Sequence, residues 1–280
     1  MSGWIIAHEA LLRGSAFAAV FVLVAIAETI VEARPLRVAR RARWTQNLTL
    51  TLLNSITLRL LFPLGATAAA IWSDGRAIGL LRLVSWPPLL EVAIAIALLD
   101  LTIYGQHVLL HAVPVLFRFH QIHHADVDFD VTLGARFHPI EMLLSMVIKL
   151  SAVVVIGASA ATVVLFETLL AVTSLFNHGN LRLPRAVDRA LRWVVVTPAM
   201  HVVHHSPEPS DRNTNFGFNI PWWDHLFGTY RERSSADPRL VGMPDHQFDI
   251  RQNVRWMLML PFRPTRPGPT SRVHTHQEAA

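Results

Sequence analysis

The chain has 280 residues, of which 52% are hydrophobic and 16% charged, and its mean hydropathy is +0.36. This balance excludes an ordinary soluble domain and indicates an integral membrane protein. Lys149 is the only lysine, so the formal net charge of +5 comes from arginines. These arginines lie beside apolar segments, which indicates membrane topology and not nucleic-acid binding. Because the sequence has no cysteine, disulfides and iron–sulfur clusters are excluded, and any metal must be held by histidines and carboxylates.

Three apolar segments in the N-terminal part of the chain are long enough to cross a bilayer. Residues 14–31 form the first, which lacks a small-residue cleavage site and is expected to remain as an anchor. The arginines at 34–43 predict a cytoplasmic loop, which leaves the N-terminus outside. Residues 48–72 and 89–110 form the second and third spans, with a loop rich in turn residues between them.

Residues 143–176 form a fourth apolar segment, which is too long for a single span. Small residues at 157–160 lie at its middle, and a turn there would return His178 to the cytoplasmic side. A single long helix would instead leave His178 on the opposite face. We predict the short hairpin, with partly inserted arms. The predicted fold is therefore all-α, a polytopic transmembrane bundle of about four spans with a cytoplasmic histidine-rich helical cap.

The chain becomes polar and proline-rich beyond residue 180, which predicts a cytoplasmic cap and not another span. Residues 254–262 are predicted to form a short interfacial helix, and residues 264–280 a disordered tail. We thus divide the chain into three parts. These are the N-terminal transmembrane helices with the arginine-rich loop (1–88), a central histidine-rich domain (89–235), and a C-terminal interfacial segment with the tail (236–280).

Nine of the 15 histidines follow short local patterns or end an apolar stripe. One pair is four residues apart, and two triplets have the spacing i, i+3, i+4, so each set lies on one face of a helix. Eight or nine imidazoles are too many for one ion, which makes two metals the natural count. The predicted ligands are His107, His111, His120, His123, His124, His178, His201, His204 and His205.

Two sets of polar residues share a helical face with predicted ligand histidines. Asp100 and Tyr104 lie on the same helical face as His107, and an acid inside a span is a candidate functional group. Either could orient a histidine through its second ring nitrogen, although a satisfied polar group is also consistent with Asp100. Glu167 and Ser174 share a stripe with His178. Five other histidines are interpreted as amphipathic surface residues: His8, His225, His246, His274 and His276.

At these residues the chain resembles the fatty acid hydroxylase superfamily, in its sterol desaturase branch, which is marked by three ordered histidine boxes. The boxes here are His107 to His111, His120 to His124, and His201 to His205. The resemblance covers about residues 90–230 and includes connecting motifs at 136–141, 178–184, 215–217 and 223–230. It implies a mostly helical membrane enzyme whose cytoplasmic histidines bind two iron ions. With oxygen, this di-iron centre would hydroxylate or desaturate a sterol, fatty acyl or related lipid.

Further residues and partners follow from the resemblance. Five residues are assigned either to bonds with the ligands' second ring nitrogens or to extra ligation: His138, Asp100, Glu141, Asn180 and Asp224. For His138, a structural hydrogen bond is an equal alternative. Some relatives carry a tenth histidine where this chain has Ser174. The electrons are expected from a separate donor, either a cytochrome b5-like protein or a ferredoxin with its reductase.

Two other functions stay open at this stage. A zinc-dependent membrane hydrolase would use a metal-bound water and an acid such as Glu141 or Asp224. A metal carrier or sensor would place its ligands near the bilayer midplane along a pathway. Zinc in the predicted site could also replace iron during purification, but zinc cannot supply the one-electron chemistry that an unactivated C–H bond requires. The aromatic segment 222–230 is expected either to pack the cap at the membrane surface or to contact substrate.

Overall fold

The computed structural model describes residues 2–237, 240–249 and 252–264. Within these residues every regular element is a helix, and five segments are long and apolar enough to cross a membrane. The five are α2 (Glu9–Ile30), α3 (Arg40–Leu61) with its continuation α4 (Gly65–Asp74), α5 (Pro88–Ala112), α7 (Pro139–Ile156) and α8 (Ala160–Asn177). The prediction of an all-α polytopic membrane protein is confirmed, with five candidate spans where about four were expected.

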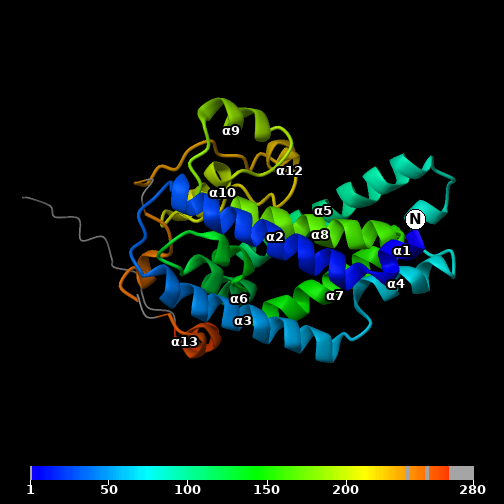
Figure 1. The fold of residues 1–280 in the computed structure, drawn as a ribbon, viewed down its shortest axis with the longest axis horizontal. Coiled ribbons are helices and arrows are strands. Elements are labelled where there is room, and N and C mark those ends of the chain that lie inside the picture. The colour runs from blue at the N-terminus through cyan, green and yellow to red at the C-terminus, as the bar shows by residue number, and fades with distance from the viewer. Residues whose placement is uncertain (1, 238–239, 250–251, 265–280) are drawn as a thin grey trace, which may run out of the picture.

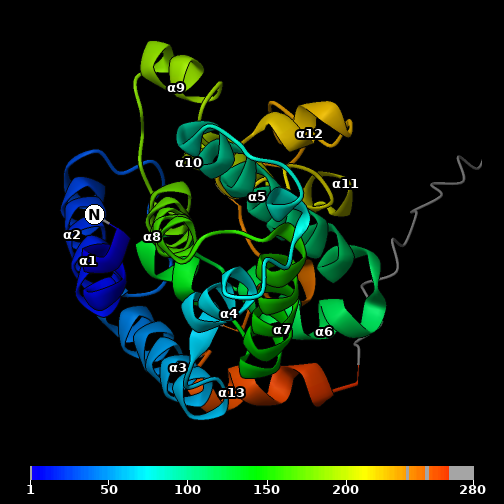
Figure 2. The ribbon, with the colours of Figure 1, turned by 90° about the vertical axis from the view of Figure 1, so that its right-hand side faces the viewer.

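The long helices lie side by side (Figure 1). The N-terminus and α4 lie at the right-hand end of that view, and Figure 2, which faces this end, shows α4 among α3, α7 and α8. A core of small and aliphatic side chains, including Ala70, Leu99, Val153 and Val163, holds α4, α5, α7 and α8 together. Many large apolar side chains on their outer faces are exposed, as expected for surfaces that contact lipid.

The second span differs from the expected uninterrupted segment 48–72. Phe62 leaves the helical conformation (φ −127°, ψ 63°), and α4 begins three residues later. Pro63 explains the break, because proline has no N–H to donate and disfavours helical backbone at the residue before it. The segment therefore crosses as two helices in series.

The hairpin after residue 143 forms as predicted, and the alternative of one long helix is excluded. Gly157 ends α7 in the left-handed conformation (φ 75°), and Ser159 caps α8 by accepting a hydrogen bond from the backbone N–H of Thr162. Each arm has 18 residues, which is about 27 Å of helix and enough for a full crossing instead of partial insertion. The hairpin returns His178 to the end of the bundle where α5 also ends.

Shorter helices surround the end of the bundle opposite the N-terminus. With their bounds, they are α6 (Pro114–His124), η2 (Val131–Ala135), α9 (Arg185–Leu191), α10 (Pro198–His204), α11 (Pro209–Arg212), α12 (Trp222–Leu226), η3 (Pro244–His246), α13 (Val254–Met259) and η4 (Leu260–Phe262). Two others, α1 (Ser2–Ala7) and η1 (Leu80–Arg82), lie elsewhere. The helix predicted at 254–262 is present as α13 and η4, and its interfacial position stays a prediction. The predicted tail lies outside the described residues from 265 onward.

Candidate metal centre

The fold brings all nine predicted ligand histidines together at one end of the bundle, in two groups. Within each group, one ring nitrogen per residue lies within 4.8 Å of the others. All of them are buried except His111, which is partly buried. The first group contains His107, His111, His120, His124 and His204, and the second His123, His178, His201 and His205.

The local sequence explains this gathering. Pro114 begins α6 directly after α5, so the first triplet folds back towards the pair at the end of α5. Thr197 caps α10 by accepting from the N–H of Met200, and Pro198 starts that helix. Sequence neighbours then separate: His123 and His124 belong to different groups, as do His204 and His205. Adjacent positions on a helix point about 100° apart, so each triplet serves both groups.

The Nε2 atoms of these histidines face one another. His124 Nε2 lies 3.1 Å from that of His111 and 3.2 Å from that of His120. His178 Nε2 lies 3.1 Å from that of His123 and 3.0 Å from that of His201. Two nitrogens bound at a right angle to one ion, each at about 2.1 Å, are separated by about 3 Å. The spacing therefore fits neighbouring ligands on a shared metal.

Several ring nitrogens in the cluster are buried without a hydrogen-bond partner in the described structure. These include Nε2 of His107, His204 and His205, together with Nδ1 of His124 and His201. A buried polar atom without a partner is rare and requires an explanation. Metal ligation supplies that explanation for the three Nε2 atoms, which lie inside the groups.

Backbone carbonyls orient several of the rings. The Nδ1–H of His107 donates to the carbonyl oxygen of Phe216 (2.8 Å), and that of His178 to the carbonyl oxygen of Ser174 (2.7 Å). In the same way, the Nδ1–H of His204 donates to the carbonyl oxygen of Thr214 (2.8 Å). This bond fixes the tautomer that leaves Nε2 with a lone pair for a metal. Residue type carries no signal for these carbonyl acceptors, so sequence reasoning missed them. Only Ser174 had been noted in the sequence, because it shares a stripe with His178. Its hydroxyl donates to the carbonyl oxygen of Gly134, and its own carbonyl oxygen accepts from His178.

Side chains orient further rings. His120 Nδ1 lies 2.8 Å from Glu141 Oε1, as the assignment of Glu141 anticipated. His111 Nδ1 lies 3.3 Å from Asn213 Oδ1, a partner that the sequence did not reveal. Because each of these rings is held through Nδ1, its Nε2 is directed into the first group.

Burial favours the neutral form of six of these rings. Burial, with a contribution from the neighbouring His120, lowers the pKa of His178 to about 3. Five other histidines have pKa values well below the ordinary value, because burial and neighbouring imidazoles lower them. These are His123, His124, His201, His204 and His205. A neutral imidazole is the form that binds metal, so these sites are ready for ligation at neutral pH.

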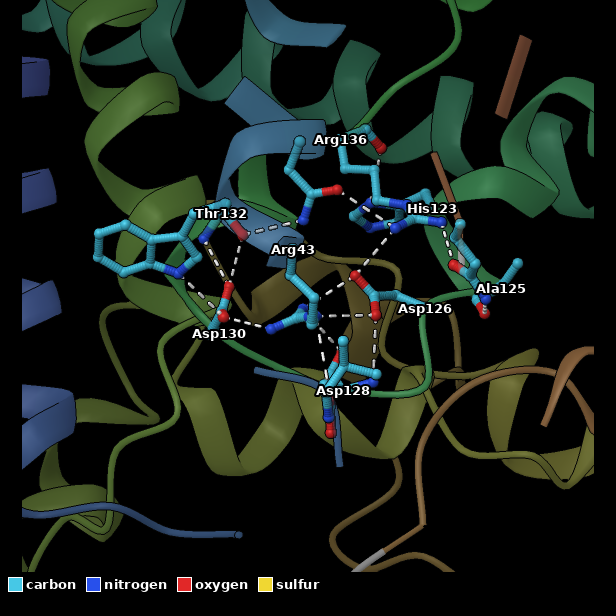
Figure 3. A network of polar contacts seen from close by, with 12 residues as sticks. Arg43, His123, Ala125, Asp126, Asp128, Asp130, Thr132 and Arg136 are labelled. Atoms are coloured by element: carbon cyan, nitrogen blue, oxygen red, sulfur yellow. Dashed lines mark hydrogen bonds and ion pairs between the residues drawn. The ribbon is translucent and has the colours of Figure 1, made fainter. Parts of the chain in front are cut away.

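A buried ion network lies behind the second group (Figure 3). Arg43 of α3 pairs with Asp126 and Asp130, and Arg136 pairs with Asp126 at 3.0 Å. Burial raises the pKa of Asp126, but the two arginines outweigh it and lower the value to about 2. The carbonyl of Arg136 accepts from His123 Nδ1 at 3.3 Å. The network thus fixes the loop between α6 and α7 to α3 and, through it, orients His123.

Comparison with known proteins decides the family. Residues 92–229, which hold all nine histidines, match the model of the fatty acid hydroxylase family. The chain belongs to the fatty acid hydroxylase superfamily. Among solved structures, none matches it significantly.

Curated relatives of this fatty acid hydroxylase chain agree with that assignment. It is 29% identical to an ornithine lipid hydroxylase of Rhizobium tropici over 160 residues, which is 56% of this chain and 47% of the relative. It is 27% identical to an alkylglycerol monooxygenase of Xenopus tropicalis over 47% of this chain and 28% of the relative. For human cholesterol 25-hydroxylase the identity is 26%, over 51% of this chain and 52% of the relative. The chain thus spans about half, or less, of the curated relatives it matches.

Two of the predicted acids hold the segment after the third histidine box. Asp224 accepts at 2.8 Å from the backbone N–H groups of Phe216 and Gly217, so it positions the carbonyl that orients His107. Asp100 accepts from Trp223 Nε1 (2.9 Å) and from other groups at 219–220. The expectation that Asp100 orients a histidine directly is wrong, because its carboxylate is taken up by this segment. Its partner on the stripe, Tyr104, bonds Thr229 at 2.9 Å.

The other predicted residues lie farther out. His138 caps α7 by accepting from the N–H of Ile140, and its Nε2 lies 3.3 Å from the carbonyl of Leu258, so its role in the described structure is structural. Asn180 accepts a hydrogen bond from the backbone N–H of Arg34 and donates one to the carbonyl oxygen of the same residue. It ties the end of the hairpin to the loop after α2.

The remaining histidines differ from one another. His225 is exposed, as expected, and stacks on Tyr230, while His8 is partly exposed. His246 is buried and lies 3.0 Å from Asp249, so its interpretation as a surface residue was wrong. The last two, His274 and His276, lie outside the described residues. In the aromatic segment, Trp222 and other large side chains are exposed, and the position of this segment at the membrane surface stays a prediction.

A cavity of about 250 Å³ opens from the first histidine group into the bundle. His107 and His120 line one end of it, beside Glu141 and Phe137. Apolar side chains of α5, α7 and α8, such as Ile103, line its middle. A lipid entering this cavity from the bilayer would reach the histidines without crossing water.

Proposed function

We propose that this protein is a di-iron oxygenase that hydroxylates or desaturates a lipid within the membrane. One observation carries the proposal: nine imidazoles, all but one of them buried, gather in two groups, and the first group borders a largely apolar cavity inside the helical bundle. The named activities of the relatives, all lipid hydroxylases or monooxygenases, support the same reaction class. The substrate is a sterol, a fatty acyl lipid or a related lipid.

The two histidine groups would each hold one iron ion. Iron bound there would supply the one-electron oxidising power that an unactivated C–H bond requires, which zinc lacks. In hydroxylation, one atom of O2 enters the C–H bond and the other leaves as water, with two electrons and two protons consumed. In desaturation, two hydrogens leave the lipid and, together with two electrons and two protons from outside, they convert both oxygen atoms of O2 to water. We propose that a separate redox partner supplies these electrons.

The protein's own residues prepare this chemistry by position and by exclusion of water. Glu141 and the carbonyls of Ser174 and Phe216 hold the rings by their outer nitrogens. Burial of the cluster keeps water from competing for a reactive oxidant. Phe137, stacked on His123 and lining the cavity, separates substrate from the loop beneath the second group.

We assign the histidine end of the bundle to the cytoplasmic side. The arginine-rich loop between α2 and α3 lies at this end, since the backbone N–H of Arg37 donates to Asp128 in the loop that follows α6. Arginine-rich short loops are retained in the cytoplasm during insertion. This placement gives a soluble electron donor access to the centre.

The geometry weighs against a carrier and leaves a hydrolase to experiment. A carrier would distribute ligands along a pathway through the membrane, whereas these ligands gather at the ends of α5 and α8. A hydrolase needs an acid that is free to act on a metal-bound water. Asp224 is not free, because the backbone N–H groups of 216–217 hold its carboxylate. Glu141 is held by His120 only through Oε1, and its Oε2 has no hydrogen-bond partner in the described structure, so the labelled-oxygen experiment below decides this alternative.

The experiment is lipid analysis of cells that express the protein under ¹⁸O2. Hydroxylation predicts a new lipid that carries one labelled oxygen, and desaturation predicts a new double bond that forms only with O2. His204→Ala should abolish the product while the protein still inserts into membranes, and the matched variant of an exposed histidine, His225→Ala, should retain it. A product that forms equally without oxygen, or that survives in His204→Ala, would exclude the proposal.

A further inference from the structure

Three charged side chains lie together inside the transmembrane bundle. Lys149 of α7 and Arg13 of α2 both pair with the carboxylate of Glu167 on α8, Arg13 at 3.0 Å. The Glu167 side chain is 4% exposed and that of Lys149 15%. Charged residues inside a span are costly and mark functional sites by default. Sequence reasoning noted Glu167 only as part of a stripe and did not interpret Lys149, although a lone lysine within an apolar segment was a signal.

This ion group carries an excess positive charge. It contains two cations and one carboxylate, and the described residues offer neither cation a second acidic partner. Glu9 lies one turn before Arg13, but its carboxylate accepts a hydrogen bond from Thr67 on α4. A purely structural pair would balance Glu167 with one cation. The second cation creates a place for one further negative charge.

The ion group and the histidines lie at opposite ends of one cavity. Arg13, Lys149 and Glu167 line it together with His107 and His120. Along α7, Glu141 at the histidine end and Lys149 are eight residues apart, which is about 12 Å of helix.

The character of the cavity changes along its length. Between its two ends, the lining includes Ile103, Met142, Leu170 and Ala171. Arg13 is 42% exposed, so the far end of the cavity reaches the surface of the bundle. An apolar passage with a cationic end matches the shape and polarity of an amphiphile with an acidic head group.

We propose that Lys149 and Arg13 bind the acidic head group of the lipid substrate, a carboxylate in the simplest case, while its chain extends to the histidines. Glu167 holds the two cations in place before the substrate arrives. The proposal rests on the proposed function and narrows its substrate to lipids with an anionic group. The anion neutralises the excess charge, which an uncharged lipid such as a sterol leaves unpaired.

The test measures binding and not turnover. Purified full-length protein in detergent at pH 8 is titrated with the fluorescent fatty acid cis-parinaric acid and, separately, with its uncharged methyl ester. We expect the wild type to bind the acid about tenfold more tightly than the ester. Lys149→Met should remove most of this preference while leaving ester binding nearly unchanged, and Lys149→Arg should keep it. Arg59→Met, which removes an exposed arginine of α3 outside the cavity, is the matched control and should behave as wild type.

The outcomes separate this proposal from the proposed function. Equal affinities of the wild type for acid and ester, or an equal loss of both in Lys149→Met, would overturn the head-group assignment. If Lys149→Met does not fold, Arg13→Gln decides, because its side chain is partly exposed and it should also weaken only acid binding. Neither oxygen nor an electron donor is needed. A wild type that prefers the acid but yields no oxygen-dependent lipid product would overturn the oxygenase and not the binding site.

Discussion

Glu141 Oε1 lies 2.8 Å from Nδ1 of His120, and both side chains are buried. The bond joins the start of α7 to the end of α6 and turns the ring so that Nε2 points into the first group. A carboxylate bonded to the outer nitrogen of a ligand histidine fixes the orientation of the ring at a metal. This pair links the fold of the hairpin to the chemistry of the centre.

Replacement of Glu141 should therefore weaken metal binding without unfolding the bundle. We expect Glu141→Gln to lower metal affinity about 10- to 100-fold, as measured by competition with a chelator on the purified protein. Glu232→Gln changes an exposed glutamate and serves as the control. Unchanged metal affinity in Glu141→Gln would show that this bond does not support the ligand.

Substitution of Gly134 tests whether the second histidine group depends on close packing between Gly134 and Ser174. A Cβ at this position would lie 2.5 Å from the carbonyl oxygen of Ser174, the atom that accepts from His178. We expect Gly134→Ala to shift this carbonyl, to cost about 1–3 kcal/mol of stability, and to lower metal content.

Gly105→Ala is the control for that prediction. Gly105 of α5 is two residues before His107, and an added Cβ there meets nothing within 4 Å. Gly105→Ala should therefore keep full metal content in the same metal analysis. Equal metal content in the two variants would contradict the packing argument.

Asp224 and Asp100 are expected to differ in their effects. Asp224→Asn replaces one of two accepting oxygens by a donor, so it should loosen Phe216 and, through it, His107. Asp100→Asn weakens the attachment of α5 to Trp223 and should lower thermal stability more than metal affinity. Melting curves and chelator competition on both variants distinguish the two roles. A larger loss of metal affinity in Asp100→Asn would reverse our assignment.

The metal-free protein should lose stability on acidification. Burial, with neighbouring imidazoles, lowers the folded-state pKa of His178 to about 3, and those of other cluster histidines are also lowered. The unfolded chain has histidines with a pKa of about 6.5, so below that pH it binds more protons than the folded chain. The free energy of unfolding should therefore fall as pH decreases from about 6.5. Thermal melting of the metal-free protein between pH 7.5 and 5 measures this, and a constant midpoint would contradict it.

The hairpin and the nine histidines were accessible from sequence because both depend on local pattern. Segment length and Gly157 predicted the turn, and helical spacing predicted which imidazoles share a face. The division of His123 and His124 between two groups was not accessible, because it depends on how α6 packs against α10 and the end of α8. The carbonyl acceptors also arise only from tertiary packing, and the break at Pro63 was overlooked within a strongly apolar segment.

The central claim is a two-iron centre, and metal analysis of the purified protein tests it most directly. We predict two irons per chain in the wild type, with both lost or strongly reduced in His204→Ala and His201→Ala, which remove one ligand from each group. A single metal per chain, or zinc alone in a protein that yields no oxygen-dependent lipid product, would contradict the account.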